Sequence, residues 1–174
     1  VGGESREEGN GARFFRTLYN PIWDEDIYCM RNLFIRLAKV RNVLSKLPFT
    51  FAIDNVEHNG LWTAARIHQY PRGGGFFQGH TDHITGPITE TEGIPYYQVV
   101  LTMTAKPRDF ENGGAFVDIG GNRICIDDYA IPGDILVYDG RTHHGVEDID
   151  PSLPLDLTIF GGRVAAFATL YRTI

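Results

Sequence analysis

The sequence lacks a long apolar run, has no excess of basic residues and contains few cysteines. No stretch approaches the roughly 20 apolar residues that a membrane-spanning helix needs, so we expect no membrane partner. The net charge of -6 disfavours nucleic acid as a partner, because a phosphate backbone is bound by clustered Lys and Arg. The two cysteines, Cys29 and Cys125, lack the spacing of a zinc site, and we expect both to be reduced and buried in a cytoplasmic protein.

The length of 174 residues and the hydrophobic content of 43% are typical of one globular domain with its own core. Residues 1–13 are rich in glycine and charge, which is typical of a disordered leader or an expression-derived extension. We therefore expect a single domain over residues 14–174, present as a monomer or a homodimer.

One segment has the periodicity of a helix. Asn20-Pro21 suits the first turn, the acidic residues 24–26 suit the N-terminal end of the helix dipole, and Pro48 marks its end. The apolar residues that recur at helical spacing are Ile27, Met30, Leu33, Phe34, Leu37, Val40 and Leu44. We expect this helix to pack on a sheet.

After Pro48, short β-rich segments alternate with turn residues. The predicted strands are Phe49–Val56, Leu61–Tyr70, Phe76–His80, Tyr96–Thr104, Ala115–Ile119, Arg123–Ile126, Ile135–Tyr138, His144–Val146 and Arg163–Tyr171. Regular strand spacing without helical patterns between the strands indicates a mostly β protein, either a sandwich or a barrel. The stretch Glu147–Thr158, with acidic residues among prolines, predicts a loop.

Four of the six histidines fall in two tight groups, residues 79–83 (Gly-His-Thr-Asp-His) and residues 141–145 (Arg-Thr-His-His-Gly). A His-x-Asp on an extended chain places both side chains on one face, because strand side chains alternate. With a distant third ligand, two imidazoles and one carboxylate leave three metal positions open, which suits Fe(II). A structural zinc site fills all four positions with protein ligands. The His-x-Asp alone is equally compatible with a polar surface loop.

Seven stretches, in order, carry a resemblance that covers residues 61–172. They are residues 66–70 (RIHQY), 79–82 (GHTD), 98–101 (QVVL), 110–116 (FENGGAF), 132–138 (PGDILVY), 144–146 (HGV) and 162–167 (GRVAAF). Each motif is loose, but their order resembles the Fe(II)/2-oxoglutarate-dependent dioxygenase superfamily, in the layout of its prolyl-hydroxylase-like and phytanoyl-type branches. The resemblance implies a double-stranded β-helix (jelly roll) with the N-terminal helix packed on the major sheet.

The resemblance also implies the metal ligands. His80 and Asp82 match the first two iron ligands, and His144 matches the third. His143 is the alternative to His144, because the two side chains point to opposite faces of a strand and only one can ligate. His83 is expected beside the site or at the surface. Asp82 favours hydroxylation over halogenation, since a Gly or Ala replaces this carboxylate in halogenating relatives.

Two further matches concern the co-substrate, 2-oxoglutarate. Arg163 matches the basic residue that pairs with its distal carboxylate, and a guanidinium can hold a carboxylate through two parallel hydrogen bonds. Arg163 follows His144 by 19 residues, a longer gap than is usual in the family. Arg66 and Arg172 are the alternatives. Tyr70 matches a tyrosine that hydrogen-bonds the same co-substrate.

Together these matches imply an enzyme that uses Fe(II), 2-oxoglutarate and O2 to oxidise, most simply to hydroxylate, an unactivated C–H bond. We expect the substrate to be a small-molecule metabolite or natural product, because the mouth of the site is predicted to be aromatic and arginine-rich. The residues predicted there are Arg72, Phe76, Phe77, Gln78, Arg108 and Arg141. The alternatives are a prolyl-type hydroxylase of a protein or peptide and a non-catalytic, cupin-like module that binds a metal or a sugar.

Overall fold

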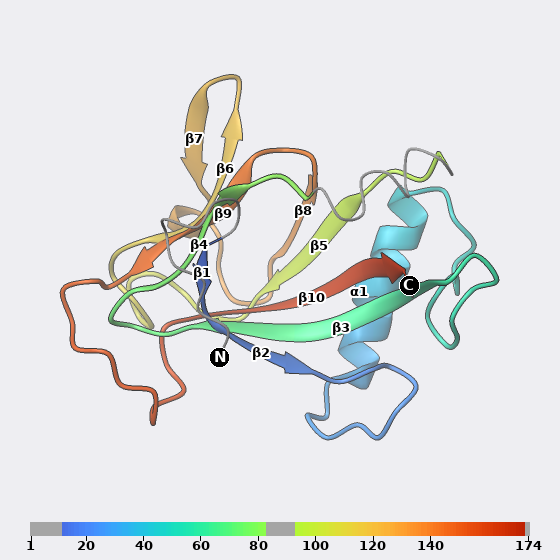
Figure 1. Cartoon of the computed structure of the whole chain (residues 1–174), viewed down its shortest axis with the longest axis horizontal. Helices are drawn as coiled ribbons and strands as arrows, with labels where there is room; N and C mark the ends of the chain where they lie inside the picture. The colour runs from blue at the N-terminus through green and yellow to red at the C-terminus, as the bar shows by residue number, and fades with distance from the viewer. Residues whose placement is uncertain (1–11, 83–92, 173–174) are drawn as a thin grey trace.

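Two antiparallel five-stranded sheets face each other in the computed structural model, which describes residues 12–82 and 93–172 (Figure 1). The minor sheet has the order β1-β4-β9-β6-β7, and the major sheet has the order β2-β3-β10-β5-β8. The strands are β1 (Arg13–Phe14), β2 (Arg16–Tyr19), β3 (Leu61–Tyr70), β4 (Gly75–His80), β5 (Tyr97–Thr102), β6 (Gly114–Ile119), β7 (Asn122–Cys125), β8 (Ile135–Asp139), β9 (His144–Ile149) and β10 (Arg163–Arg172). This arrangement is a double-stranded β-helix, so the predicted fold class is confirmed.

The major sheet separates the core from the pocket, because its side chains alternate between two faces. Val164, Ala166 and Ala168 of β10 pack outward into the main apolar core beneath the helix. Ala165 and Phe167 point to the other face, where they form a second apolar cluster. The long β3–β10 pairing, from Arg163 opposite Tyr70 to Arg172 opposite Leu61, fixes this alternation over ten residue pairs.

The helix α1 (Arg31–Leu44) covers the outer face of the major sheet, as predicted. Figure 1 shows α1 beside β10 and β3. The buried residues Phe34, Leu37 and Ala38 of the helix pack into the same core as β10. The prediction placed the helix start near Pro21, which is wrong by ten residues. Asp26 explains the difference, because its Oδ1 accepts hydrogen bonds from the amides of residues 30 and 31, at 2.9 and 3.1 Å, and so satisfies the first free N–H groups of the helix.

The predicted strand Phe49–Val56 is also wrong, because this segment forms consecutive turns. The amide of Phe51 donates to the carbonyl of Pro48, and the amide of Ile53 donates to that of Thr50. Ala52 has a positive φ of 55°, which an extended strand does not allow. The turns bury Ala52 and Ile53, whereas Phe49 and Val56 at the two ends of the segment are exposed.

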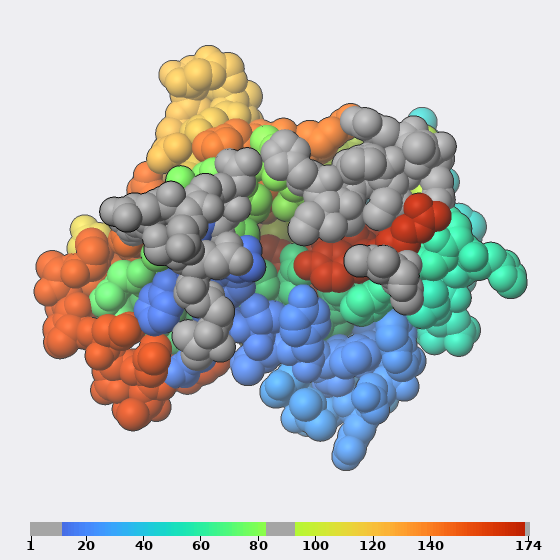
Figure 2. Space-filling view, in the orientation of Figure 1, coloured from blue at the N-terminus to red at the C-terminus, as the bar shows by residue number. Residues whose placement is uncertain are grey.

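Strands β1 and β2 were not predicted, and they add one strand to each sheet. Residues 1–11 of the predicted leader lie outside the described residues, whereas Ala12 is buried and Arg13 begins β1. Strand β1 pairs with β4 and β2 pairs with β3, and Figure 2 shows the blue N-terminal segment beside the green ones. Phe15, between the two strands, stacks on His68 at 4.5 Å between ring centroids. The N-terminal segment therefore forms part of one wall beside the pocket.

The other strand predictions are confirmed to within two residues at their starts and ends, except that β9 continues to Ile149 into the predicted loop. Both cysteines are free, but Cys29 is exposed, so the expectation that both are buried is wrong. Within the part of the chain that the structure describes, no helix is long and apolar enough to cross a membrane.

Candidate metal centre

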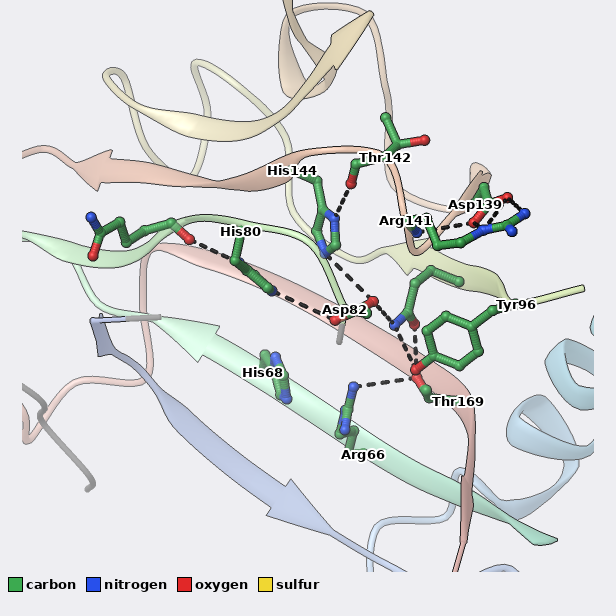
Figure 3. Close-up of polar contacts among 12 residues, drawn as sticks. Arg66, His68, His80, Asp82, Tyr96, Asp139, Arg141, Thr142, His144 and Thr169 are labelled. Atoms are coloured by element: carbon green, nitrogen blue, oxygen red, sulfur yellow. Dashed lines mark hydrogen bonds and ion pairs between the residues drawn. The ribbon is translucent and has the colours of Figure 1, made fainter. Parts of the chain in front are cut away.

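Three side chains from two adjacent strands converge at one point, as Figure 3 shows. His80 is the last residue of β4, His144 is the first residue of β9, and the two are directly opposite in the register. Asp82 follows β4 by two residues, and its amide donates to the carbonyl of Gly140 at 2.9 Å. One potential ligand atom from each of the three residues lies within 4.8 Å of the others. The structure thus brings together the three residues predicted as ligands.

Gly140 permits this approach of the chain after β8 to Asp82. A side chain at position 140 would meet the Asp82 Oδ2 at 2.7 Å and the Tyr96 ring. A Cβ with contacts under 3.0 Å would displace the Tyr96 ring or the Asp82 carboxylate, so only glycine fits at position 140 without moving them. The glycine before the second histidine group is therefore part of the site's construction.

Backbone carbonyls set the protonation of both imidazoles. The Nδ1 of His80 lies 2.8 Å from the carbonyl oxygen of Gln78, and the Nδ1 of His144 lies 2.7 Å from that of Thr142. A carbonyl oxygen can only accept, so each Nδ1 carries the hydrogen and each Nε2 keeps a free lone pair. This is the arrangement of metal-bound histidines, whose second nitrogen donates to an outer partner.

The Asp82 carboxylate is oriented by a buried polar chain. Its Oδ2 accepts a hydrogen bond from Gln98 Nε2 at 2.7 Å, and Gln98 Oε1 accepts one from the Thr169 hydroxyl at 2.9 Å. Tyr96 also lies beside Gln98, with its hydroxyl 3.2 Å from Nε2. Burial opposes ionisation, but the adjacent His80, the hydrogen bond from Gln98 and the nearby His144 outweigh it and hold the pKa of Asp82 below its usual value.

The environment of His144 favours its neutral, ligating form. Burial lowers the pKa of His144, although the Thr142 carbonyl and the Asp82 charge act in the opposite direction. The ring of His144 packs 4.5 Å from that of His80 and 4.9 Å from that of Tyr138, between centroids. A low imidazole pKa and an ionised carboxylate are what a divalent cation needs.

His143, the alternative third ligand, points away from the other two ligands. Its Nδ1 lies 2.8 Å from Asp118 Oδ2, and its side chain is 45% exposed. His83 lies outside the described residues.

No protein-family model matches this sequence, and no curated protein is found as a relative. Among solved structures, the chain is similar to a prolyl-4-hydroxylase from Pseudomonas putida, with a TM-score of 0.57 and 13% identity over 98% of this chain and 78% of that one. It is also matched to an RmlC-like cupin protein from Desulfovibrio desulfuricans at 17% identity, over 64% of this chain and 74% of that one. The TM-score of 0.31 for the cupin is too low to support an argument. What the chain shares with the hydroxylase is the fold.

One cavity is lined by His80, Asp82 and His144 and by both residues predicted for the co-substrate. Tyr70 is buried, and its ring centroid lies 5.6 Å from the guanidinium carbon of Arg163. Burial raises the pKa of Tyr70 to about 12, so it is a neutral hydrogen-bond donor. Arg172 lies at the exposed end of β10 and does not line the cavity.

Arg163 has a buried carboxylate partner that the sequence did not reveal. Its Nε donates to Asp127 Oδ2 at 2.7 Å, and both residues are almost fully buried. Burial opposes the charge of Arg163, but Asp127 outweighs it and the pKa lies above its usual value. No hydrogen bond among the described residues uses the terminal nitrogens of Arg163, so they stay available to a ligand.

The predicted mouth residues are mostly elsewhere. Of these residues, only Phe77 lines the cavity. The three arginines form ion pairs instead: Arg72 with Asp150, Arg108 with Asp109, and Arg141 with Asp139. The cavity-lining polar residues that were not predicted as site residues include His68, Gln98 and Tyr138, and Arg66 was considered only as an alternative. The alternation of β3 would have revealed His68 and Arg66, since residues 66, 68 and 70 share one face.

The donor set suits a divalent cation with open positions. Two Nε2 lone pairs and one carboxylate form the facial combination typical of non-haem Fe(II), with no fourth protein ligand to close it among the described residues. His80, Asp82 and His144 can thus hold a metal in the cavity.

Proposed function

We propose that this chain is an Fe(II)- and 2-oxoglutarate-dependent oxygenase that hydroxylates an unactivated C–H bond of a small molecule. The observation that carries the proposal is the convergence of His80, Asp82 and His144 with both Nε2 atoms free and directed at one point. A buried arginine and a neutral tyrosine in the same cavity, Arg163 and Tyr70, supply what a keto acid needs.

The protein's own groups have distinct tasks in this proposal. His80, Asp82 and His144 hold Fe(II), and the terminal nitrogens of Arg163 bind the distal carboxylate of 2-oxoglutarate, assisted by the Tyr70 hydroxyl. When bound, Fe(II), 2-oxoglutarate and O2 supply the oxidation: the keto acid loses CO2 to give succinate, and one oxygen atom enters the substrate C–H bond.

Asp127 orients the co-substrate anchor. Its hydrogen bond to Arg163 Nε fixes the guanidinium plane, so less freedom is lost when a carboxylate binds. Apolar side chains enclose the space above the metal and limit the access of water to it. They are Val100, Ala115, Phe116, Ile126, Leu136, Val146 and Phe167.

A small molecule is the favoured substrate because of the cavity's lining. Apolar and aromatic side chains form most of it, with a few polar groups among them, as is common in small-molecule sites. The alternative is a peptidyl proline, a compact ring that could enter from the mouth. Proline-containing peptides and free metabolites assayed side by side for stimulated succinate release would separate the two.

The proposed function is tested by succinate formation from 2-oxoglutarate in air with added Fe(II). We expect slow succinate release by the wild-type protein, lost in Asp82→Ala and retained in Asp118→Ala, a matched control whose carboxylate lies outside the cavity. Full activity in Asp82→Ala would contradict the ligand assignment. A wild-type protein that binds Fe(II) and forms no succinate would instead favour a non-catalytic, cupin-like metal-binding module.

A further inference from the structure

Arg66 is a buried cation without a carboxylate partner. It lies in the middle of β3, is only 8% exposed, and lines the cavity. Its Nε has no hydrogen-bond partner, and its NH2 group makes one long contact of 3.3 Å to the Thr169 hydroxyl. The rings of Phe167 and Tyr171 lie 5.5 and 4.9 Å from the guanidinium carbon. They support its charge but provide no counter-ion.

The two cavity arginines differ in this respect. Arg163 is neutralised by Asp127, whereas no carboxylate among the described residues forms an ion pair with Arg66. A buried charge with an unsatisfied donor is costly unless something pairs with it. An anion that enters the cavity would therefore be bound favourably at Arg66.

The two arginines also lie at opposite ends of the cavity floor. In the β3–β10 register, Arg163 is opposite Tyr70 and Phe167 is opposite Arg66. At about 3.3 Å per residue, positions 66 and 70 are roughly 13 Å apart along β3. His68 lies between them, and its pKa is lowered well below the usual value by burial and then by the charges of Arg66 and Arg163.

Arg66 is connected to the metal centre by hydrogen bonds. Figure 3 shows the chain that runs from Arg66 through Thr169 and Gln98 to the Asp82 carboxylate. A ligand group held at Arg66 thus lies on the Asp82 side of the site, away from the end of the cavity at Arg163.

We propose that Arg66 binds a carboxylate of the substrate, so that the substrate of this enzyme is a small carboxylic acid. The inference rests on the proposed function, which assigns Arg163 to 2-oxoglutarate. One carboxylate is held at each end of the floor, and the substrate C–H bond is presented to the metal between them.

The test uses protein loaded with Zn(II) and 2-oxoglutarate, because Zn(II) accepts the same ligands but has no redox chemistry. Benzoate and hexanoate are titrated by calorimetry against their neutral counterparts, benzamide and hexanamide. We expect at least one of the two acids to bind about tenfold or more tightly than its amide. We expect Arg66→Gln to abolish that preference, Arg66→Lys to keep part of it, and Arg36→Gln, an exposed helix arginine, to keep all of it.

Equal binding of acid and amide to the wild-type protein, or no binding of either acid, would overturn the inference. So would a loss of 2-oxoglutarate affinity in Arg66→Gln, because Arg66 would then anchor the co-substrate. Melting temperatures of the variants identify any that fail to fold. If Arg66→Gln does not fold, the acid-over-amide preference of Arg66→Lys tests the inference in its place. Failure of the proposed function would look different: the wild-type protein would neither bind 2-oxoglutarate nor form succinate.

Discussion

Gln98 is expected to control metal affinity without touching the metal. Its Nε2 donates to Asp82 Oδ2 at 2.7 Å, and its Oε1 accepts the Thr169 hydroxyl at 2.9 Å. Gln98→Met keeps the approximate volume of the side chain but removes both hydrogen bonds. Asp82 would then lose the partner that fixes its carboxylate, and its pKa would rise because one of the hydrogen bonds that lowers it is gone.

The size of the effect follows from comparable outer partners of metal ligands, whose loss costs about 10- to 100-fold in metal affinity. That range corresponds to roughly 1.4–2.7 kcal/mol of binding free energy. Asp82 keeps its place on the chain through the amide bond to Gly140, so binding is weakened and not abolished.

The assay is a competition titration of Zn(II) or Mn(II) against a chelator of known affinity. Gln69→Met is the matched control, because Gln69 lies on β3, is fully buried, and hydrogen-bonds Gly161 outside the cavity. We expect Gln69→Met to lower the stability of the fold but to leave metal affinity unchanged. Wild-type metal affinity in Gln98→Met, or equal losses in both variants, would refute the positioning role of Gln98.

Three further changes have defined outcomes. Arg163→Gln leaves the Asp127 carboxylate buried without a cation, so we expect a loss of about 3–5 kcal/mol of unfolding free energy in a urea titration. Adding Asp127→Asn to Arg163→Gln should restore part of that stability but not 2-oxoglutarate binding. A double variant that recovers both would argue against Arg163 as the residue that binds 2-oxoglutarate. His143→Ala should keep wild-type metal affinity in the same competition titration, and a tenfold loss would reverse the choice of third ligand. The pKa of Asp150 is lowered because hydrogen bonds from the amides of residues 111–112 outweigh the opposing effect of burial. The stabilisation that ionised Asp150 provides is present above its unfolded pKa near 4 and is lost as the pH falls through its folded pKa. Asp150→Asn should therefore lower the free energy of unfolding by about 1–3 kcal/mol at pH 7 and by distinctly less at pH 2. Equal losses at both pH values would contradict this reasoning.

Local patterns predicted most strands of the two sheets and the His-x-Asp pair of the candidate site. Alternating apolar residues bounded by glycine turns defined β3 to its first and last residue, because both of its faces are buried in a regular pairing. His80 and Asp82 were identifiable because a single residue of extended chain separates them, which places both side chains on one face. His144 was preferred over His143 on the resemblance, and the structure turns its ring toward the other two ligands.

Contacts between distant segments were not predictable in the same way. The Arg163–Asp127 pair joins positions 36 residues apart, and no local pattern identifies Asp127 in its short 3-10 turn, Ile126–Asp128. The start of α1 was missed because Asp26 caps the helix from four residues away, whereas periodicity alone continues back toward Pro21. Segment 49–56 had the composition of a strand, but turn hydrogen bonds and the positive φ of Ala52 give it a folded course in place of an extended one.

The binding of Fe(II) and 2-oxoglutarate at one site is tested most directly by the visible spectrum of the protein without O2. We expect a weak charge-transfer band that requires both Fe(II) and 2-oxoglutarate, that persists in His143→Ala, and that is absent in Asp82→Ala. A wild-type spectrum without a band when both additions are saturating, or an undiminished band in Asp82→Ala, would contradict the site built from His80, Asp82 and His144.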